Sequence, residues 1–365
     1  MERAYTRALE LSSGAPQAPS AFPALWGLAV FYGMRGELDR ALELGERNLV
    51  IAEANGDRLM RLIAHHGLWA VHYFRGELTA ALHHLDEGEP LYAPVEHRGA
   101  ALVYGWDPKM AALSHRACVL WALGRIDQAV EVSRQAVEHA RALGHPLSLA
   151  HAMYFSAWIR QCRREPEACR EEAEALITHA TEEGIPFLKF NGLALRGWAL
   201  VEHGELERGI ADLVESLGSS IIGGSLGQTP HLANLAAALA RAGRLAEARQ
   251  RLDECKALTT TGERFHEPEI QRLDAELILA ESGGAGGAPS GARERAEALL
   301  HAAIECASRQ GARTLELRAV TTLARLCGRG AKGKQARTRL ADLLARFAEG
   351  SDTADLQEAH RLVAR

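Results

Sequence analysis

The fold is decided by a short stretch of sequence that reads Gly36-Glu37-Leu38-Asp39-Arg40-Ala41. Variants of this stretch recur along the chain, each with a turn followed five positions later by a small residue. They occupy residues 36–41, 76–81, 124–129, 163–168, 204–209, 243–248, 291–296 and 331–336. The copies begin about 40 residues apart, and such regular spacing is the sequence signature of a repeat protein.

A second small residue lies seven positions before most of these turns. It is Ala29, Ala117, Ser156, Gly197, Ala236 or Ala324. Small residues on both sides of a tight turn let two antiparallel helices approach closely. The sequence therefore predicts an all-α protein, a right-handed α-α superhelix of about eight helical pairs with a period near 40 residues. We expect residues 1–365 to form one solenoid domain, because such pairs bury their apolar faces only by stacking.

Other signals predict where the helices begin, end and are interrupted. Five glycines follow helical runs and are expected to be left-handed: Gly56, Gly144, Gly184, Gly262 and Gly311. Thr229-Pro230 is typical of an N-cap followed by proline at the first helical position. A longer link at residues 88–107 and a low-complexity insertion at residues 282–291 lengthen the period.

Composition narrows the class of protein without indicating a reaction. The 365 residues carry 42 basic and 47 acidic side chains, a net charge of −5 that argues against a nucleic-acid-binding protein. No apolar run is long enough for a transmembrane helix, and the amino terminus lacks the apolar core of a signal peptide. The six cysteines form no CxxC pair, so we expect reduced thiols and a cytoplasmic location, with no membrane contact.

The repeats resemble tetratricopeptide repeats of longer than usual period. More specifically, the chain resembles the carboxy-terminal repeat region of bacterial signal-transduction ATPases, which include MalT-like regulators and predicted ATPases associated with adenylate cyclase. The resemblance lies in residues 22–28, 104–108, 196–200, 261–265 and 352–359. It implies a sensor or interaction region of a larger protein. Because residues 2–12 resemble the second helix of an earlier repeat, we expect an excised segment or a homologue that lacks the ATPase.

Two short motifs are typical of catalysis but stand in the wrong context. Residues 328–334 fit G-x-x-x-x-G-K, yet Gln335 follows where a phosphate loop needs a hydroxyl, and the preceding run is helical in pattern. Residues 223–227 fit G-x-S-x-G around Ser225, but no strand precedes them. We interpret the first as a turn and the second as a linker between repeats.

Histidines and a basic run are weaker candidates for binding. Histidine occurs at positions 65, 66, 72, 83 and 84, but no HExxH motif and no suitably placed cysteine completes a metal site. Seven basic residues and no acidic residue occur between Leu317 and Ala341. Such a run is more often a solvated face than a contact for an acidic partner or nucleic acid. We therefore expect no metal and no cofactor.

The inner wall of the superhelix is the candidate site. In tetratricopeptide arrays the first helix of each pair lines the concave side, and aromatic side chains with polar edges are good recognition elements there. Carried over to this chain, that geometry selects Trp26, His66, Tyr73, His115, Trp121, Met153, Tyr154, Arg160, Asn191, Trp198, Asn234, Arg241, Arg272 and Glu276. We expect this groove to bind a protein, a peptide or a small effector without catalysing a reaction.

Two alternatives remain open from the sequence alone. A small-molecule enzyme or sensor could use the groove together with the 88–107 insertion, where Tyr104, Trp106, Asp107 and Lys109 lie close to His115 in sequence. Asp107 is also well placed to cap a helix that begins at Pro108. The other alternative is a purely structural assembly segment. The sequence does not indicate the oligomeric state.

Overall fold

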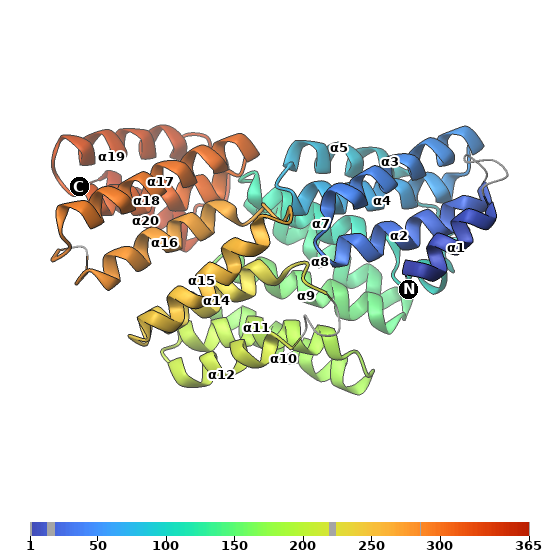
Figure 1. Ribbon diagram of the computed structural model, residues 1–365, viewed down its shortest axis with the longest axis horizontal. Helices are drawn as coiled ribbons and strands as arrows, with labels where there is room; N and C mark the ends of the chain where they lie inside the picture. Colours follow the sequence, from blue (N-terminus) through green and yellow to red (C-terminus); the bar gives the residue numbers. More distant parts are fainter. Residues whose placement is uncertain (1, 13–18, 219–223, 285, 365) are drawn as a thin grey trace.

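The computed structural model describes residues 2–12, 19–218, 224–284 and 286–364. These residues contain no strand, and they confirm the predicted array of helical pairs (Figure 1). The first four pairs are α2 (Phe22–Met34) with α3 (Leu38–Asn55), α4 (Arg58–Phe74) with α5 (Leu78–Gly88), α7 (Pro108–Ala122) with α8 (Ile126–Leu143), and α9 (Pro146–Cys162) with α10 (Pro166–Glu182). The next four are α11 (Pro186–Glu202) with α12 (Leu206–Ser216), α14 (Gln228–Arg241) with α15 (Leu245–Thr259), α16 (Glu267–Glu281) with α17 (Ser290–Gln310), and α18 (Arg313–Cys327) with α19 (Ala331–Leu344).

Shorter elements flank and interrupt these pairs. Helix α1 (Glu2–Ser12) and the 3-10 turn η1 (Pro19–Ala21) precede them, and α20 (Ala354–Val363) follows them. The 88–107 link contains the 3-10 turn η2 (Glu89–Leu91) and the short helix α6 (Ala100–Tyr104). Among the residues described, no helix is long and apolar enough to cross a membrane.

The turns inside the pairs use a backbone conformation that favours glycine. Gly36, Gly76 and Gly204 have φ values of 76°, 75° and 86° there. The fourth pair has Arg164 with φ 60° at the equivalent position, and it is the only non-glycine residue with positive φ in the described ranges. The repeat in this copy therefore begins at 164, one residue later than predicted, and its buried small residue is Cys169.

The small residues beside the turns do allow close helix packing. A Cβ atom on Gly197 of α11 would lie 2.8 Å from the carbonyl oxygen of Gly209 in α12. The second pair has Trp69 where most copies have a small residue, and Gly88 of α5 makes room for it, because a Cβ there would lie 2.8 Å from the indole. Steric room near each turn therefore fixes how tightly a pair can close.

Three predicted boundaries are wrong. Helix α14 begins at Gln228 after Gly227, so Thr229 lies inside the first turn rather than at the N-cap. Its hydroxyl donates a 2.5 Å hydrogen bond to Glu263, and the amide of Gly227 donates to the same carboxylate. Helix α17 begins at Ser290, so the last residues of the predicted 282–291 insertion are helical. Gly262 has φ 120°, outside the left-handed helical region expected for it.

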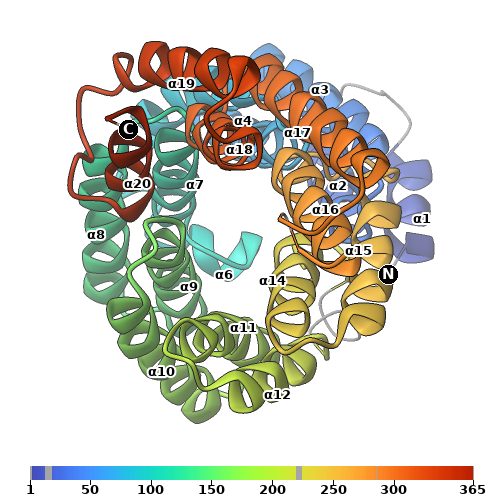
Figure 2. The same ribbon diagram turned by 90° about the vertical axis from the view of Figure 1, so that its left-hand side faces the viewer.

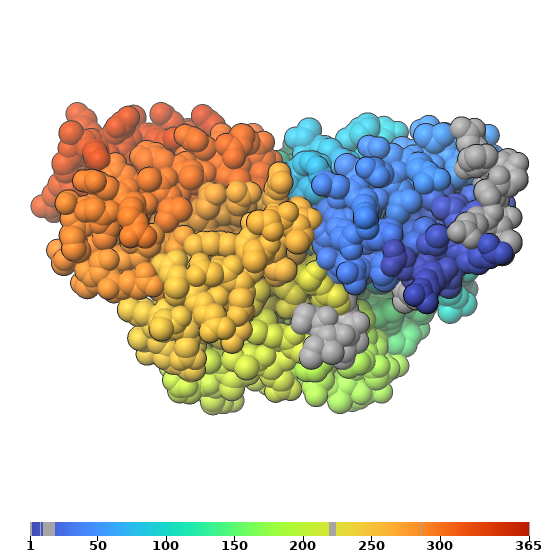
Figure 3. Space-filling model, viewed as in Figure 1, coloured from blue at the N-terminus to red at the C-terminus, as the bar shows by residue number. Residues whose placement is uncertain are grey.

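The superhelix winds far enough for its later pairs to rest on its earlier ones. Figure 2 shows the first helix of each pair facing the inside of the ring and the second facing outward. In the space-filling view the later pairs, in yellow and orange, abut the first pairs, in blue (Figure 3). The amides of Arg264 and Phe265 both donate to the carbonyl of Phe74, at 2.9 and 3.1 Å, and the amide of Leu226 donates to Met34.

Candidate ligand-binding cavity

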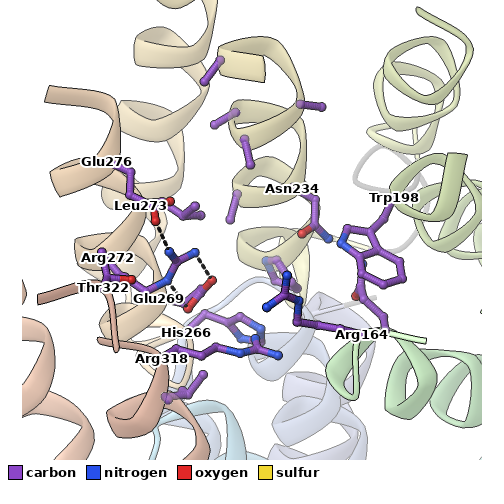
Figure 4. A pocket seen from close by; sticks show the side chains of 18 of the residues that line it. Arg164, Trp198, Asn234, His266, Glu269, Arg272, Leu273, Glu276, Arg318 and Thr322 are labelled. Carbon is purple, nitrogen blue, oxygen red and sulfur yellow. Dashed lines mark hydrogen bonds and ion pairs between the residues drawn. The ribbon is translucent and has the colours of Figure 1, made fainter. Parts of the chain in front are cut away.

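A cavity of about 510 Å³ opens on the inner wall of the superhelix (Figure 4). Its lining comes from helices α7, α9, α11, α14, α15, α16 and α18, which belong to the third and later pairs, and from α20. Residues far apart in sequence meet here because the chain closes into a ring. The cavity therefore depends on the superhelix as a whole and not on a single pair.

One side of the cavity is lined by small and aromatic residues. Helix α14 contributes five alanines to this side, and Pro230, Asn234, Ala237 and Arg241 follow one another at helical spacing along one of its faces. Trp198 of α11 lies next to them, with its indole nitrogen near the side chain of Asn234 (Figure 4). Because the alanine side chain is short, space remains between this wall and the opposite one.

The opposite side carries a network of ion pairs. Arg272 of α16 pairs with Glu269 and Glu276 of the same helix, each at 2.7 Å. Burial alone would raise the pKa of Glu269, but the charge and hydrogen bond of Arg272 lower it to about 2. Arg325 of α18 continues the network to Glu276 at 3.6 Å and to Glu358 of α20 at 3.0 Å.

The same network ties the end of the chain to the fourth pair. Asp355 of α20 pairs with Arg318 at 2.7 Å and with Arg164 at 3.1 Å. Arg318 also donates to the carbonyl of Cys162 at 2.7 Å, and its guanidinium lies 5.4 Å from the ring centre of Trp121. These contacts join α18 and α20 to the end of α9, so they close the superhelix beside the cavity.

The 88–107 insertion covers the inner wall of the earlier pairs. Figure 2 shows α6 inside the ring. Trp106 stacks on His151 with ring centres 5.0 Å apart, and its Nε1 donates to Nε2 of His66 at 3.3 Å. Tyr104 packs edge-on against Trp26 at 5.9 Å. The chain thus occupies with its own side chains the part of the wall that the first repeats would otherwise expose.

The structure separates the predicted groove residues into three groups. Six line the cavity: Trp121, Trp198, Asn234, Arg241, Arg272 and Glu276. Four of the predicted groove residues are buried outside it: Trp26, His66, Tyr73 and His115. Their expected exposure on a concave wall is wrong, because the insertion and neighbouring aromatic rings cover them.

The remaining four groove residues also lie outside the cavity. Met153 and Arg160 line a smaller cavity of about 310 Å³ formed by residues of α8, α9 and α10. Tyr154 is half-buried, and its ring packs against Phe155 with ring centres 5.1 Å apart. Asn191 is half-buried on α11 and lines neither cavity.

Sequence reasoning missed the residues that the ring closure brings to the site. Arg164, Arg318, Arg325, Asp355 and Glu358 all line the cavity. Arg318 and Arg325 belong to the basic run between 317 and 341 and lie seven residues apart, on one face of α18. That spacing was the signal in the sequence that both arginines could reach the same site. The pairing of both with α20 depends on how far the superhelix winds, which no local pattern records.

The side chains of the enzyme alternative are each engaged in structural contacts. Asp107 is fully buried, caps α7 by accepting from the amide of Met110 at 2.8 Å, and also contacts His139. Lys109 pairs with Glu89, and Nδ1 of His115 lies 2.9 Å from the carbonyl oxygen of Ala111. The capping role expected for Asp107 is confirmed, and the structure does not bring these groups to one reactive centre.

The short motifs also serve as connections. Residues 328–330 connect α18 to α19 without a preceding strand, and residues 331–334 lie within α19. Of the G-x-S-x-G stretch, Gly223 lies outside the described residues, and the following residues lead into α14. His65 and His84 meet at 3.0 Å between their Nδ1 atoms, but the described residues contain no group of three or more side chains suited to a metal ion.

Solved structures share this fold at low sequence identity. NprR in complex with its cognate peptide NprX superposes with a TM-score of 0.56 at 13% identity, over 91% of this chain and 98% of that one. A Rap protein complexed with competence and sporulation factor gives 0.53 at 11%, over 94% and 96%. The apo form of the quorum sensor NprR from B. thuringiensis gives 0.51 at 14%, over 94% and 97%.

These comparisons show the fold class and leave the family open. No protein-family model and no curated protein matches the chain. The specific resemblance to MalT-like regulators therefore stays a prediction. The shared architecture is a tetratricopeptide-like helical superhelix that covers nearly the whole of this chain.

Proposed function

We propose that this chain is a binding module that recognises a peptide in the inner cavity and carries out no chemistry itself. The observation that carries the proposal is the 510 Å³ cavity, which combines a small-residue and aromatic wall with polar groups from several repeats. Ligand sites are typically concave, largely apolar and provided with a few placed polar groups. Two structures of the same fold, those of NprR with NprX and of the Rap protein, were solved with a peptide or factor bound, which supports a peptide as the ligand.

The proposal includes a setting in the cell. We propose a cytoplasmic interaction region of a signalling protein, in which peptide binding changes the state of an attached or associated partner. Six free cysteines support a reducing compartment, because five of them are buried and none is in a disulfide.

Filling the cavity should weaken peptide binding. Ala237 lines the cavity and is half-buried on α14, so Ala237→Trp places an indole in the space left for a ligand. Peptides of six to ten random residues, displayed within a carrier protein, are selected on the full chain. We expect those recovered with the natural sequence to bind the variant at least tenfold more weakly, a loss of about 1.4 kcal/mol or more.

The matched control is Ala246→Trp, on the exposed start of α15 and outside the cavity. It should leave the affinity unchanged, and both variants should melt within a few degrees of the natural chain. Equal affinity of the Ala237→Trp variant would place the peptide site elsewhere. Recovery of no peptide with the natural chain would remove the proposed function.

A further inference from the structure

The charges that line the cavity are already satisfied within the chain. Among the described residues, five arginines and five carboxylates line it. Eight of them belong to the network of α16, α18, α20 and Arg164 described above. The other two, Arg241 and Glu202, pair with each other at 2.5 Å. The wall is therefore electrically neutral and presents no uncompensated charge to a ligand.

A charged ligand group would have to compete with these pairs. Asp355 and Glu358 hold α20 to Arg164 and to α18, so a ligand carboxylate could reach those arginines only by displacing the contacts that close the superhelix. Separating a partly buried ion pair leaves a desolvated charge without a partner, which is strongly unfavourable. The ion pairs are thus better suited to holding the ring closed than to selecting a charged ligand.

Neutral polar groups on the same cavity lack partners. Thr321 of α18 is only 5% exposed, and its hydroxyl makes no hydrogen bond. The buried Nε2 of Gln161 on α9 also has no partner, although it can donate two hydrogen bonds. A buried polar atom without a partner is costly and rare in folded proteins. Two of them from different repeats at one cavity point to a ligand that supplies neutral donors and acceptors.

We infer that the cavity binds an electroneutral peptide segment through its backbone amides, with Thr321 and Gln161 as hydrogen-bonding partners. This inference rests on the proposed function. A peptide backbone offers both an N–H donor and a C=O acceptor at each residue, which matches a hydroxyl and an amide. Small apolar side chains of the segment then pack against the alanine wall of α14 near Ala237.

Removal of one unpartnered hydroxyl tests this role. Thr321→Val keeps the shape of the side chain and deletes the oxygen. Because that oxygen has no partner in the free protein, we expect an unchanged or higher melting temperature. We expect the selected peptide to bind about five- to tenfold more weakly, which lies within the range that the loss of one net hydrogen bond gives. Isothermal titration calorimetry and thermal melting measure the two quantities.

The neighbouring residue provides a matched control. Thr322 also lines the cavity, but its hydroxyl already accepts a hydrogen bond from Arg325 at 3.2 Å. Thr322→Val should therefore change the affinity less than twofold. Equal effects of the two valine variants on affinity, or a lower melting temperature with unchanged affinity for Thr321→Val, would overturn the assigned role of Thr321.

Salt dependence tests electroneutrality separately. Attraction between charges is screened strongly between about 0.05 and 0.5 M salt, whereas neutral hydrogen bonds are not. We expect the affinity of the selected peptides to change less than threefold over this range, and the peptides to carry no shared charged position. Binding that weakens more than tenfold, or a charged position shared by the selected peptides, would overturn this inference and leave the proposed function standing. Failure to recover any peptide would remove both.

Discussion

Replacing Phe265 by alanine is expected to lower the free energy of unfolding by about 3–5 kcal/mol, the range for a fully buried phenylalanine. Phe265 is 1% exposed and lies between successive turns of the superhelix. Its ring packs 4.6 Å from that of Tyr73 on α4 and 6.3 Å from that of Trp158 on α9. Because the side chain joins repeats distant in sequence, its loss should also broaden the urea unfolding transition measured by circular dichroism.

The broadening follows from the architecture. In an open solenoid each repeat contacts only its neighbours, so a local defect weakens one interface. Here the linker around Phe265 holds the later helical pairs against the earlier ones, through hydrogen bonds to Phe74. Phe31→Ala on α2, at a half-buried position, is the matched control and should cost much less. If both variants lost the same stability, the packing of Phe265 between the later and the earlier helical pairs would contribute little to folding.

The fold was predictable because its determinants are local and repeated. The turn that begins at Gly36 recurs with positive φ at Gly76, Gly124, Arg164, Gly204 and Gly243, so several weak signals combine into a strong one. The error of one residue at Arg164 arose where an arginine takes the conformation that glycine takes elsewhere. The predicted helix start at Thr229 was wrong for a different reason. Glu263, 34 positions away from Thr229, accepts hydrogen bonds from the Thr229 hydroxyl and the Gly227 amide at the start of α14.

The site was less predictable because two long-range events shape it. The insertion that contains Trp106 folds back onto His66 and covers a wall that the repeat pattern would leave open. The winding of the superhelix brings Asp355 to Arg164 and Arg318. Helical periodicity indicates which residues face inward. It does not indicate which inward-facing residues another segment of the chain will cover.

The inner wall also contains histidines that burial keeps neutral. Burial lowers the pKa of His115, His231 and His266 to about 4 each and that of His151 to about 3, and it lowers that of His66 well below its usual value. In the unfolded chain imidazoles take up protons below about pH 6.5. Between the folded and unfolded pKa values the unfolded state binds more protons, so stability should fall as the pH drops.

A buried carboxyl acts in the opposite direction. Burial raises the pKa of Glu263 to about 7, although hydrogen bonds from Thr229 and Gly227 oppose this. In the unfolded chain this carboxyl ionises at lower pH, so the protein loses the stability that Glu263 contributes as the pH rises toward 7. Because five histidines oppose one carboxyl, the net change between pH 7 and pH 4 should still be a loss of stability.

His151→Phe isolates one of these histidines. The imidazole stacks on Trp106 and lies 5.1 Å from the ring of Phe155, and its Nδ1 has no hydrogen-bond partner, so a phenyl ring should preserve the packing. Each buried histidine costs about 1.4 kcal/mol per pH unit below 6.5, which gives about 2 kcal/mol at pH 5. We therefore expect the free energy of unfolding of the variant, relative to that of the natural chain, to be about 2 kcal/mol higher at pH 5 than at pH 8. Urea unfolding at the two pH values measures this difference. At pH 8 both states of His151 are neutral, so that measurement serves as the internal control. The same difference at both pH values would mean that His151 takes up its proton within the folded protein.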